Sequence, residues 1–343
     1  IATDQLLVNL IFTEDEKANW DIFIEPEATP ETEAATEPEA DDMLFLLERI
    51  DVANFDLIYT DRKGNYTFSM LETSGVVNGD FEGMIATLDI TALSNAVSYV
   101  YEGVGYLEKR KVEVATSLIA NFETFEFQFE ADKSRLNQIP LSVKGGFAMP
   151  TDTLVFDIQF EAPELTMKQV LDLVPSAYAH YMKDLQAKGD VTLNGSLTGI
   201  MTDEIYPAMA FNFEIVNGEI KHPQLPEVLQ IEKLDASLSK AQGSLDLFEF
   251  GLHRFDMVLA NNPLSMKARF ASLMTDPEMD VQIKGVLDFE ALTKIVPIDS
   301  VVLTGMLRAD ATVQGRYSDV ENNRFDRFTS AGQFDLSNFK LVN

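Results

Sequence analysis

Apolar and polar residues alternate along most of the chain from Met43 onward. In FEFQFE (125–130), phenylalanine takes every second position and a polar residue each position between. Side chains two positions apart lie on the same face of a β-strand, so such a run predicts a strand with one apolar face and one solvated face. The same alternation occurs over 154–161, 209–215, 264–270 and 279–283.

Short segments rich in Gly, Asn and Pro separate several of these runs. Examples are DRKGN (61–65), KGG (144–146) and NNP (261–263). Segments of this composition form turns between neighbouring antiparallel strands. The alternating runs and the turns together predict a meandering antiparallel sheet.

Helical spacing of apolar residues is rare in this chain. It predicts three short helices, over 165–174, 176–188 and 289–296, with Pro175, Gly189 and Pro297 directly after them. The predicted fold class is therefore mainly β: a curved antiparallel β-sheet, shaped as a trough or half-barrel, with a few short α-helices.

A six-residue pattern, aliphatic-x-Asn-[Phe/Gly]-x-aliphatic, occurs three times. Its copies are VANFDL (52–57), IVNGEI (215–220) and LSNFKL (336–341). Because Asn tolerates a left-handed backbone, we expect each of these asparagines to lie at a bend where a strand turns into its hairpin partner.

The second and third copies belong to a longer correspondence. In both, a short helical pattern precedes a strand that begins and ends with glycine, and the two glycines are ten residues apart: Gly189 and Gly199 in one, Gly305 and Gly315 in the other. Self-similarity of this kind indicates repeated structural units. We therefore expect a repeat-built sheet with two related repeats, over 164–221 and 289–343.

Composition divides the chain into segments. Residues 25–42 contain eight acidic residues, three prolines and no basic residue, which predicts a disordered acidic linker because such a segment has little apolar area to bury. Residues 1–24 precede it and are expected to be a fragment of a preceding sheet region. After it we expect a first β-sheet module over 43–163 and a second over 164–343.

Charge and composition exclude several classes of function. The chain has 56 acidic and 26 basic residues and a formal net charge of −30, which disfavours nucleic acid as a partner because phosphate backbones would be repelled. Cysteine is absent and the three histidines are widely separated, so thiol chemistry and histidine-centred metal sites are not expected. GSLTG (195–199) resembles a nucleophile elbow only superficially, because its serine does not occupy the middle position.

We therefore predict no catalytic residue, no metal site and no cofactor, and a protein that is not an enzyme. One alternative stays open: a hydrolase with two convergent carboxylates among the many acidic residues. No apolar run is long enough for a membrane-spanning helix. Since the sequence starts at Ile1 within an apolar pattern, we expect further chain upstream.

A sheet of one-faced strands must cover its apolar face with another layer or with an apolar ligand. The pattern alone leaves both interpretations open: a closed hydrophobic core, or a groove that shields an acyl chain. If the face is a groove, its candidate lining residues are Phe125, Phe127, Phe129, Leu154, Phe156, Ile158, Phe160, Met209, Phe211, Phe213, Ile215, Leu264, Met266, Phe270, Met279, Val281 and Ile283.

Parts of the chain resemble the AsmA family. FLLERIDVANFDLIYTD (45–61) resembles that family's unit of a strand, an Asn-Gly bend and a Tyr-Asp strand. The strand from Gly189 to Gly199, followed by Pro207 to Gly218 and IKHPQLP (220–226), is similar to its C-terminal region. The resemblance covers most of the chain from Met43 to Asn343, although the N-terminal membrane helix usual in the family does not occur.

The resemblance implies a cell-envelope protein of Gram-negative bacteria, located in the periplasm and anchored to the inner membrane by a helix upstream of Ile1. It implies a role in outer-membrane biogenesis, in which AsmA-like and TamB-like proteins form β-sheet troughs for lipid transport. The expected function is thus a non-enzymatic factor that shields or transfers phospholipid or another acyl lipid along an apolar groove, with envelope assembly proteins as possible partners. The alternative is a structural or interaction scaffold of the cell envelope with a closed apolar core and no lipid ligand.

Overall fold

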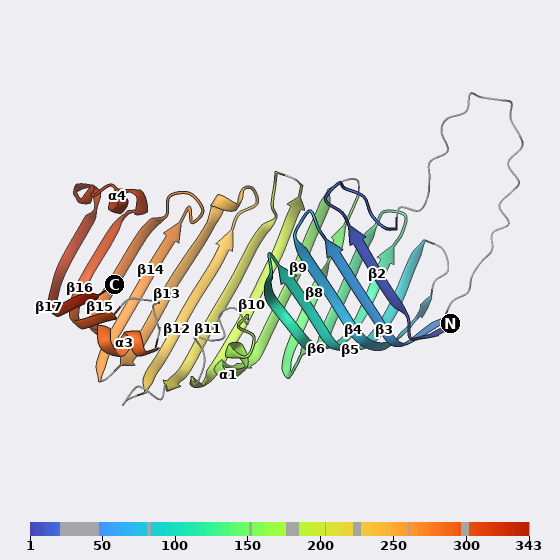
Figure 1. The fold of residues 1–343 in the computed structure, drawn as a ribbon, viewed down its shortest axis with the longest axis horizontal. Coiled ribbons are helices and arrows are strands. Elements are labelled where there is room, and N and C mark those ends of the chain that lie inside the picture. The colour runs from blue at the N-terminus through green and yellow to red at the C-terminus, as the bar shows by residue number, and fades with distance from the viewer. Residues whose placement is uncertain are drawn as a thin grey trace, which may run out of the picture. The chain divides into compact units, whose positions relative to one another are not determined.

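A computed structural model describes residues 1–20, 48–80, 84–150, 153–175, 185–202, 204–221, 228–259, 261–295 and 302–342. The predicted acidic linker, 25–42, lies outside these residues. The chain divides into two compact units: unit 1 is chiefly Ile1–Glu123, and unit 2 is chiefly Gln138–Val174 and Tyr178–Asn343, together with Thr124–Lys133. The predicted fold class is confirmed, because the described residues are mainly β-strands of an open antiparallel sheet with a few short helices (Figure 1).

Unit 1 is built on an antiparallel meander with a parallel edge. Its strands are β1 (Ala2–Asp4), β2 (Leu7–Phe12), β3 (Arg49–Asp61), β4 (Tyr66–Asp80), β5 (Ile85–Tyr101) and β6 (Val104–Asn121). Strands β3 to β6 pair antiparallel in chain order, whereas β1 and β2 both pair parallel with β3. The first residues of the chain are therefore the edge of this sheet, and a parallel return is possible because a long segment separates β2 from β3.

Unit 2 continues the antiparallel pattern over many strands. They are β7 (Glu126–Leu136), most of which belongs to this unit, β8 (Ile139–Ala148), β9 (Leu154–Thr166), β10 (Gln186–Met201), β11 (Ala208–Lys221), β12 (Leu229–Lys240), β13 (Phe248–Leu259), β14 (Asn262–Ala271), β15 (Glu278–Asp288), β16 (Val302–Arg316) and β17 (Thr329–Val342). From β8 to β17, each strand pairs antiparallel with the next. The ladder runs without a break from β9 to β10, so the compact units do not divide at the predicted module boundary, 163/164.

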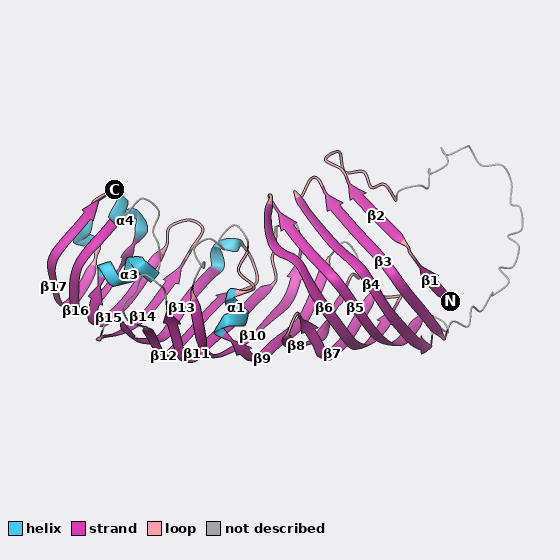
Figure 2. Ribbon diagram, turned by 60° about the horizontal axis from the view of Figure 1, so that its bottom comes forward, coloured by secondary structure: helices cyan, strands magenta, loops and turns pink. Residues whose placement is uncertain are grey.

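The helices are short, and Figure 2 shows α1, α3 and α4 beside the strands of unit 2. They are α1 (Met167–Leu171), α3 (Phe289–Ile295) and α4 (Tyr317–Glu321), with 3-10 turns η2 (Leu245–Leu247) and η3 (Phe325–Arg327). The helices predicted over 165–174 and 289–296 are present in shortened form. The helix predicted over 176–188 is wrong at its end, where residues 186–188 begin β10; residues 176–184 lie outside the described part of the chain.

The repeated asparagines adopt the expected backbone in an unexpected place. Asn54, Asn217 and Asn338 have φ of 51° to 52°, which is left-handed as predicted. Each lies inside a strand, however, not in a hairpin turn. There the pairing register shifts, so each asparagine forms a β-bulge.

In the two long repeats, a glycine of the neighbouring strand faces the bulge. Gly189 has φ of +130° and packs against the backbone of Asn217 and Gly218; Gly305 has φ of +108° and packs against Asn338 and Phe339. A side chain at either glycine would overlap the facing backbone. The two repeats therefore share this local geometry as well as their order of elements.

Another glycine-rich segment was predicted as a turn and is part of a strand. KGG (144–146) lies inside β8, where Gly145 has φ of +124° and sits directly over the backbone of Asp157 and Ile158 on β9. Glycine here permits close approach of two strands and does not reverse the chain.

Candidate apolar binding face

The registers of unit 2 place the predicted apolar positions on one face of its sheet. Residues directly opposite each other in a ladder share a face. Phe160 on β9 is opposite Gly195 on β10, Gly195 is opposite Phe211 on β11, and Phe211 is opposite Leu238 on β12. The row continues from Leu238 to Phe250 on β13.

The same face extends across the following strands. Phe250 is opposite Phe270 on β14, and Phe270 is opposite Met279 on β15. By the same registers, fourteen of the seventeen candidate residues lie on this face, which we call the apolar face: Leu154, Phe156, Ile158, Phe160, Met209, Phe211, Phe213, Ile215, Leu264, Met266, Phe270, Met279, Val281 and Ile283.

The three remaining candidates come from the start of unit 2. Phe127 joins the apolar face, because its ring stacks on that of Phe147 with centroids 4.8 Å apart, and Phe147 is opposite Phe156. Phe129 follows two positions later on β7 and shares that orientation. Phe125 does not belong to the strand: it is exposed, has φ of +53° and lies in the turn before β7. Its place in the alternation was a wrong prediction, because a left-handed residue breaks the two-residue period.

One end of the apolar face is covered. Here Met167 and Val170 of α1, and Ala291 and Leu292 of α3, pack on the strands. The strand residues beneath them form the hydrophobic core, which includes Leu165, Val191, Ile215, Leu229, Ile231, Met257 and Leu264. The candidates Ile215 and Leu264 are thus core residues, and Phe213 and Ile283 pack against that core.

The other end of the apolar face is open. Met209, Phe211 and Leu238 are large, adjacent apolar side chains that remain exposed. The strand ends, turns and short helices at this end also expose apolar side chains, and they are Met149, Met201, Leu245, Leu247, Met274, Tyr317, Val320 and Phe325. The open end therefore combines an exposed strip of the face with apolar turns. Of these residues, only Met209 and Phe211 were found from the sequence. Turn residues follow no two-residue period, and Leu238 was missed although it lies on β12 opposite Phe211.

A buried lysine marks the edge of the open end. Lys240 is 2% exposed and lies opposite Met209. Its Nζ donates hydrogen bonds to the carbonyl oxygens of Tyr206, Ala241 and Gly243 at 3.2, 2.8 and 3.1 Å, and burial lowers the pKa of this ammonium. All three donors are engaged, so Lys240 fastens the β12–β13 turn and is not positioned to bind an external anion.

The opposite face of unit 2 is polar. A hollow of about 440 Å³ lies over β13 to β17 and is lined by Arg254, Asp256, Lys284 and Asp310 among others. Arg254 pairs with Asp256, and Lys284 pairs with Asp310 at 2.8 Å. Hydrogen bonds from Ser265 and Arg254 lower the pKa of the Asp256 carboxyl. The carboxylates of Asp256 and Asp310 in this hollow are thus each paired with a basic side chain. Such pairs are typical of a solvated surface.

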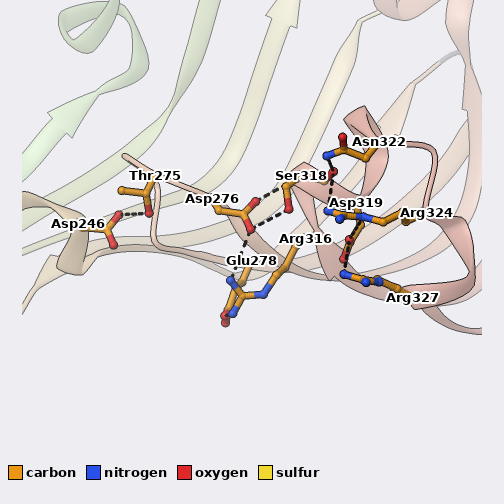
Figure 3. Close-up of polar contacts among 10 residues, drawn as sticks. All are labelled: Asp246, Thr275, Asp276, Glu278, Arg316, Ser318, Asp319, Asn322, Arg324 and Arg327. Atoms are coloured by element: carbon orange, nitrogen blue, oxygen red, sulfur yellow. Dashed lines mark hydrogen bonds and ion pairs between the residues drawn. The ribbon is translucent and has the colours of Figure 1, made fainter.

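Polar contacts hold the turns of the open end together (Figure 3). Asp276 accepts hydrogen bonds from the backbone N–H and the hydroxyl of Ser318, both at 2.9 Å, which joins the β14–β15 turn to α4. The buried carboxylate of Asp319 pairs with Arg324 at 2.8 Å and with Arg327 at 3.4 Å. These contacts fix the loop that follows β16.

Comparison of the chain with protein-family models, with curated proteins and with solved structures finds no match. Among the described residues, no three His, Asp or Glu side chains are grouped so that they could hold a metal ion. In the same part of the chain, no helix has both the length and the apolar character needed to cross a bilayer.

Proposed function

We propose that this protein is a non-enzymatic factor that shields or transfers an acyl lipid along its apolar face. The observation that carries the proposal is the exposed strip at the open end of unit 2, formed by Met209, Phe211 and Leu238 on adjacent strands. Water contact with apolar surface is unfavourable by about 25 cal/mol per Å². An acyl chain lying across the strip removes such contact on both surfaces.

The resemblance to the AsmA family gives the proposal its setting. The resemblance implies a protein of the periplasm with a role in outer-membrane biogenesis. We propose phospholipid as the acyl lipid in that setting and envelope assembly proteins as possible partners. The negative net charge, −30, disfavours attraction to anionic headgroups, so binding would rest on the acyl chain.

A closed scaffold is the second candidate function, and the covered end favours it. There α1 and α3 already supply the layer that a structural sheet requires. The two candidates differ at the open end, because a scaffold gains nothing from an exposed apolar strip unless a protein partner covers it.

Native mass spectrometry of the purified chain, after incubation with phosphatidylethanolamine vesicles and removal of the vesicles, tests the proposal. We expect bound phospholipid with the natural sequence and a several-fold loss with the double substitution Met209→Gln and Phe211→Gln. Asn212→Gln, on the opposite face of β11, is the matched control and should bind as the natural chain does. Absence of lipid in repeated preparations would support the scaffold instead. Equal binding by the double variant would show that the lipid does not lie on this strip.

A further inference from the structure

Unit 1 contains a continuous array of aromatic side chains. Ring centroids are 6.1 Å apart for Trp20 and Tyr59, 5.7 Å for Tyr59 and Tyr66, and 6.0 Å for Tyr66 and Tyr99. Tyr106 extends the array, at 6.4 Å from Tyr99 and 6.5 Å from Tyr101. The tyrosine array, as we call these six residues, contains the single tryptophan of the chain and five of its nine tyrosines.

The tyrosines of β3, β4 and β5 lie on one face of the unit 1 sheet, which they share with Leu57, Met70 and Val97. Tyr59 is opposite Phe68, and Phe68 is opposite Tyr99. One step toward the strand ends, Tyr66 is opposite Tyr101. Opposite residues share a face, so these side chains stand together on one side of β3, β4 and β5.

Along each of these strands, the face changes character toward one end. On β3 it passes from Leu57 to Tyr59, and on β5 from Val97 to Tyr99. On β4 it passes from Met70 through Phe68 to Tyr66. The apolar row of Leu57, Met70 and Val97, with Arg110 of β6 opposite Val97, thus gives way to tyrosines near the β3–β4 and β5–β6 turns. Tyrosine and tryptophan concentrate in the same way where hydrocarbon meets the polar headgroups of a bilayer.

Two hydroxyl groups of the array already have hydrogen-bond partners: Tyr66 bonds with Tyr59, and Tyr101 donates to Glu102. Burial, above all, raises the pKa of Tyr66, with further contributions from Tyr59 and Asp61, and the neighbouring Glu102 raises the pKa of Tyr101. Both phenols stay protonated near neutral pH. A hydrogen bond between two phenols uses only one of their two O–H groups, so the Tyr59–Tyr66 pair keeps one donor for phosphate or ester oxygens. Trp20, Tyr101 and Tyr106 are exposed.

The turns beside the array carry charges of both signs. Arg62 and Lys63 follow Asp61 in the β3–β4 turn, and Glu102 lies in the β5–β6 turn. Lys63 pairs with Glu16. A zwitterionic headgroup, with one phosphate and one ammonium, matches the mixed charges of these turns better than a purely anionic headgroup does.

We propose that the tyrosine array binds the zwitterionic headgroup of a phospholipid whose acyl chains lie on the apolar residues of β3 to β5. This inference rests on the proposed function and adds an orientation of the bound lipid to it. In unit 1 the headgroup lies toward the β3–β4 and β5–β6 turns. Leu57, Met70 and Val97 contact the hydrocarbon, and the tyrosine hydroxyls face the polar group.

Trp20 provides a direct test, because it is the only tryptophan and its fluorescence reports on this array alone. The purified chain is loaded with phosphatidylcholine that carries a nitroxide either on the headgroup or at the end of an acyl chain, and bound label is counted by electron paramagnetic resonance. We expect the headgroup label to quench most of the Trp20 fluorescence and the chain-end label to quench little of it.

Removal of tyrosine hydroxyl groups from the array tests their part in headgroup binding. The double substitution Tyr59→Phe and Tyr66→Phe keeps the rings and should weaken quenching by the headgroup label several-fold. Thr67→Val removes a hydroxyl group on the other face of β4 and should change nothing. Equal or stronger quenching by the chain-end label overturns the inference. A decrease of Trp20 fluorescence on addition of free maltose also overturns it, because it would indicate a sugar site. Bound label without any quenching overturns the inference but leaves the proposed function intact; no bound label at all overturns both.

Discussion

The two ends of the apolar face of unit 2 follow one sequence pattern and differ in what covers them. On β11, Ile215 is 5% exposed and Phe211, four residues earlier on the same face, is 40% exposed. The difference comes from α1 and α3, which pack over one end only. Alternation thus decides which side of the sheet a residue occupies, and the connections between strands decide whether it becomes core or surface.

The largest expected effect separates these two positions directly. Ile215→Ala should lower the free energy of unfolding by about 2–4 kcal/mol, since it removes buried methyl groups and leaves a cavity. Phe211→Ala should lower it by less than about 1 kcal/mol, because its ring already contacts water. Urea unfolding with a common m-value measures both. Equal losses would mean that the open end is as well packed as the covered end.

The second largest effect on stability is expected at the bulge of Asn217, which faces Gly189 beneath α1. Gly189 has φ of +130°, and an added Cβ would lie 2.7 Å from the Cα of Gly218. Gly189→Ala should therefore destabilise unit 2 by about 2–3 kcal/mol through strain and overlap. Gly103, in the β5–β6 turn, also has positive φ but open space around it, so Gly103→Ala should cost only about 1 kcal/mol. A similar loss at both positions would show that backbone strain alone matters and that close packing at the bulge does not.

The cap of α1 tests how firmly the covered end is closed. Thr166 and Gln169 form a reciprocal capping box, in which the Gln169 N–H donates to the Thr166 hydroxyl and the Thr166 N–H donates to the Gln169 side chain. Thr166→Ala should cost about 1 kcal/mol, whereas Thr166→Ser should cost less because it keeps the acceptor. Amide hydrogen exchange at Val191, beneath the helix, should speed up only in the alanine variant; unchanged exchange there would mean that α1 contributes little to the cover.

Much of the fold follows from the sequence because alternation is a local property. Fourteen of the candidate residues share one face in the registers, which the two-residue period alone predicts. The left-handed conformation of Asn217 also followed from its residue type. Its position inside a strand did not, because tolerance of a left-handed backbone is the same in a bulge and in a hairpin turn.

Features that depend on distant contacts were not predictable in this way. The tyrosine array joins residues from several strands and a loop, such as Trp20, Tyr59 and Tyr106, and only the register of those strands brings the rings together. A tyrosine near each strand end was its only signal in the sequence. The burial of Lys240 had no signal, since it depends on carbonyl groups that a turn directs inward.

The smallest effect concerns the open end, where polar contacts take the place of an apolar cover. Hydrogen bonds from Ser318, and then Arg316, lower the pKa of the Asp276 carboxyl below its ordinary value of 3.8. The folded state therefore binds this proton less tightly than the unfolded state, so the contribution of Asp276 is present above pH 3.8 and is lost as pH falls through the folded pKa. Asp276→Asn should be slightly less stable than the natural chain at pH 7 and equal to it at strongly acidic pH, with the difference at pH 7 reduced by salt. A loss that persists unchanged in acid would show that the hydrogen-bond geometry at Ser318, and not the charge of the carboxylate, fastens this turn.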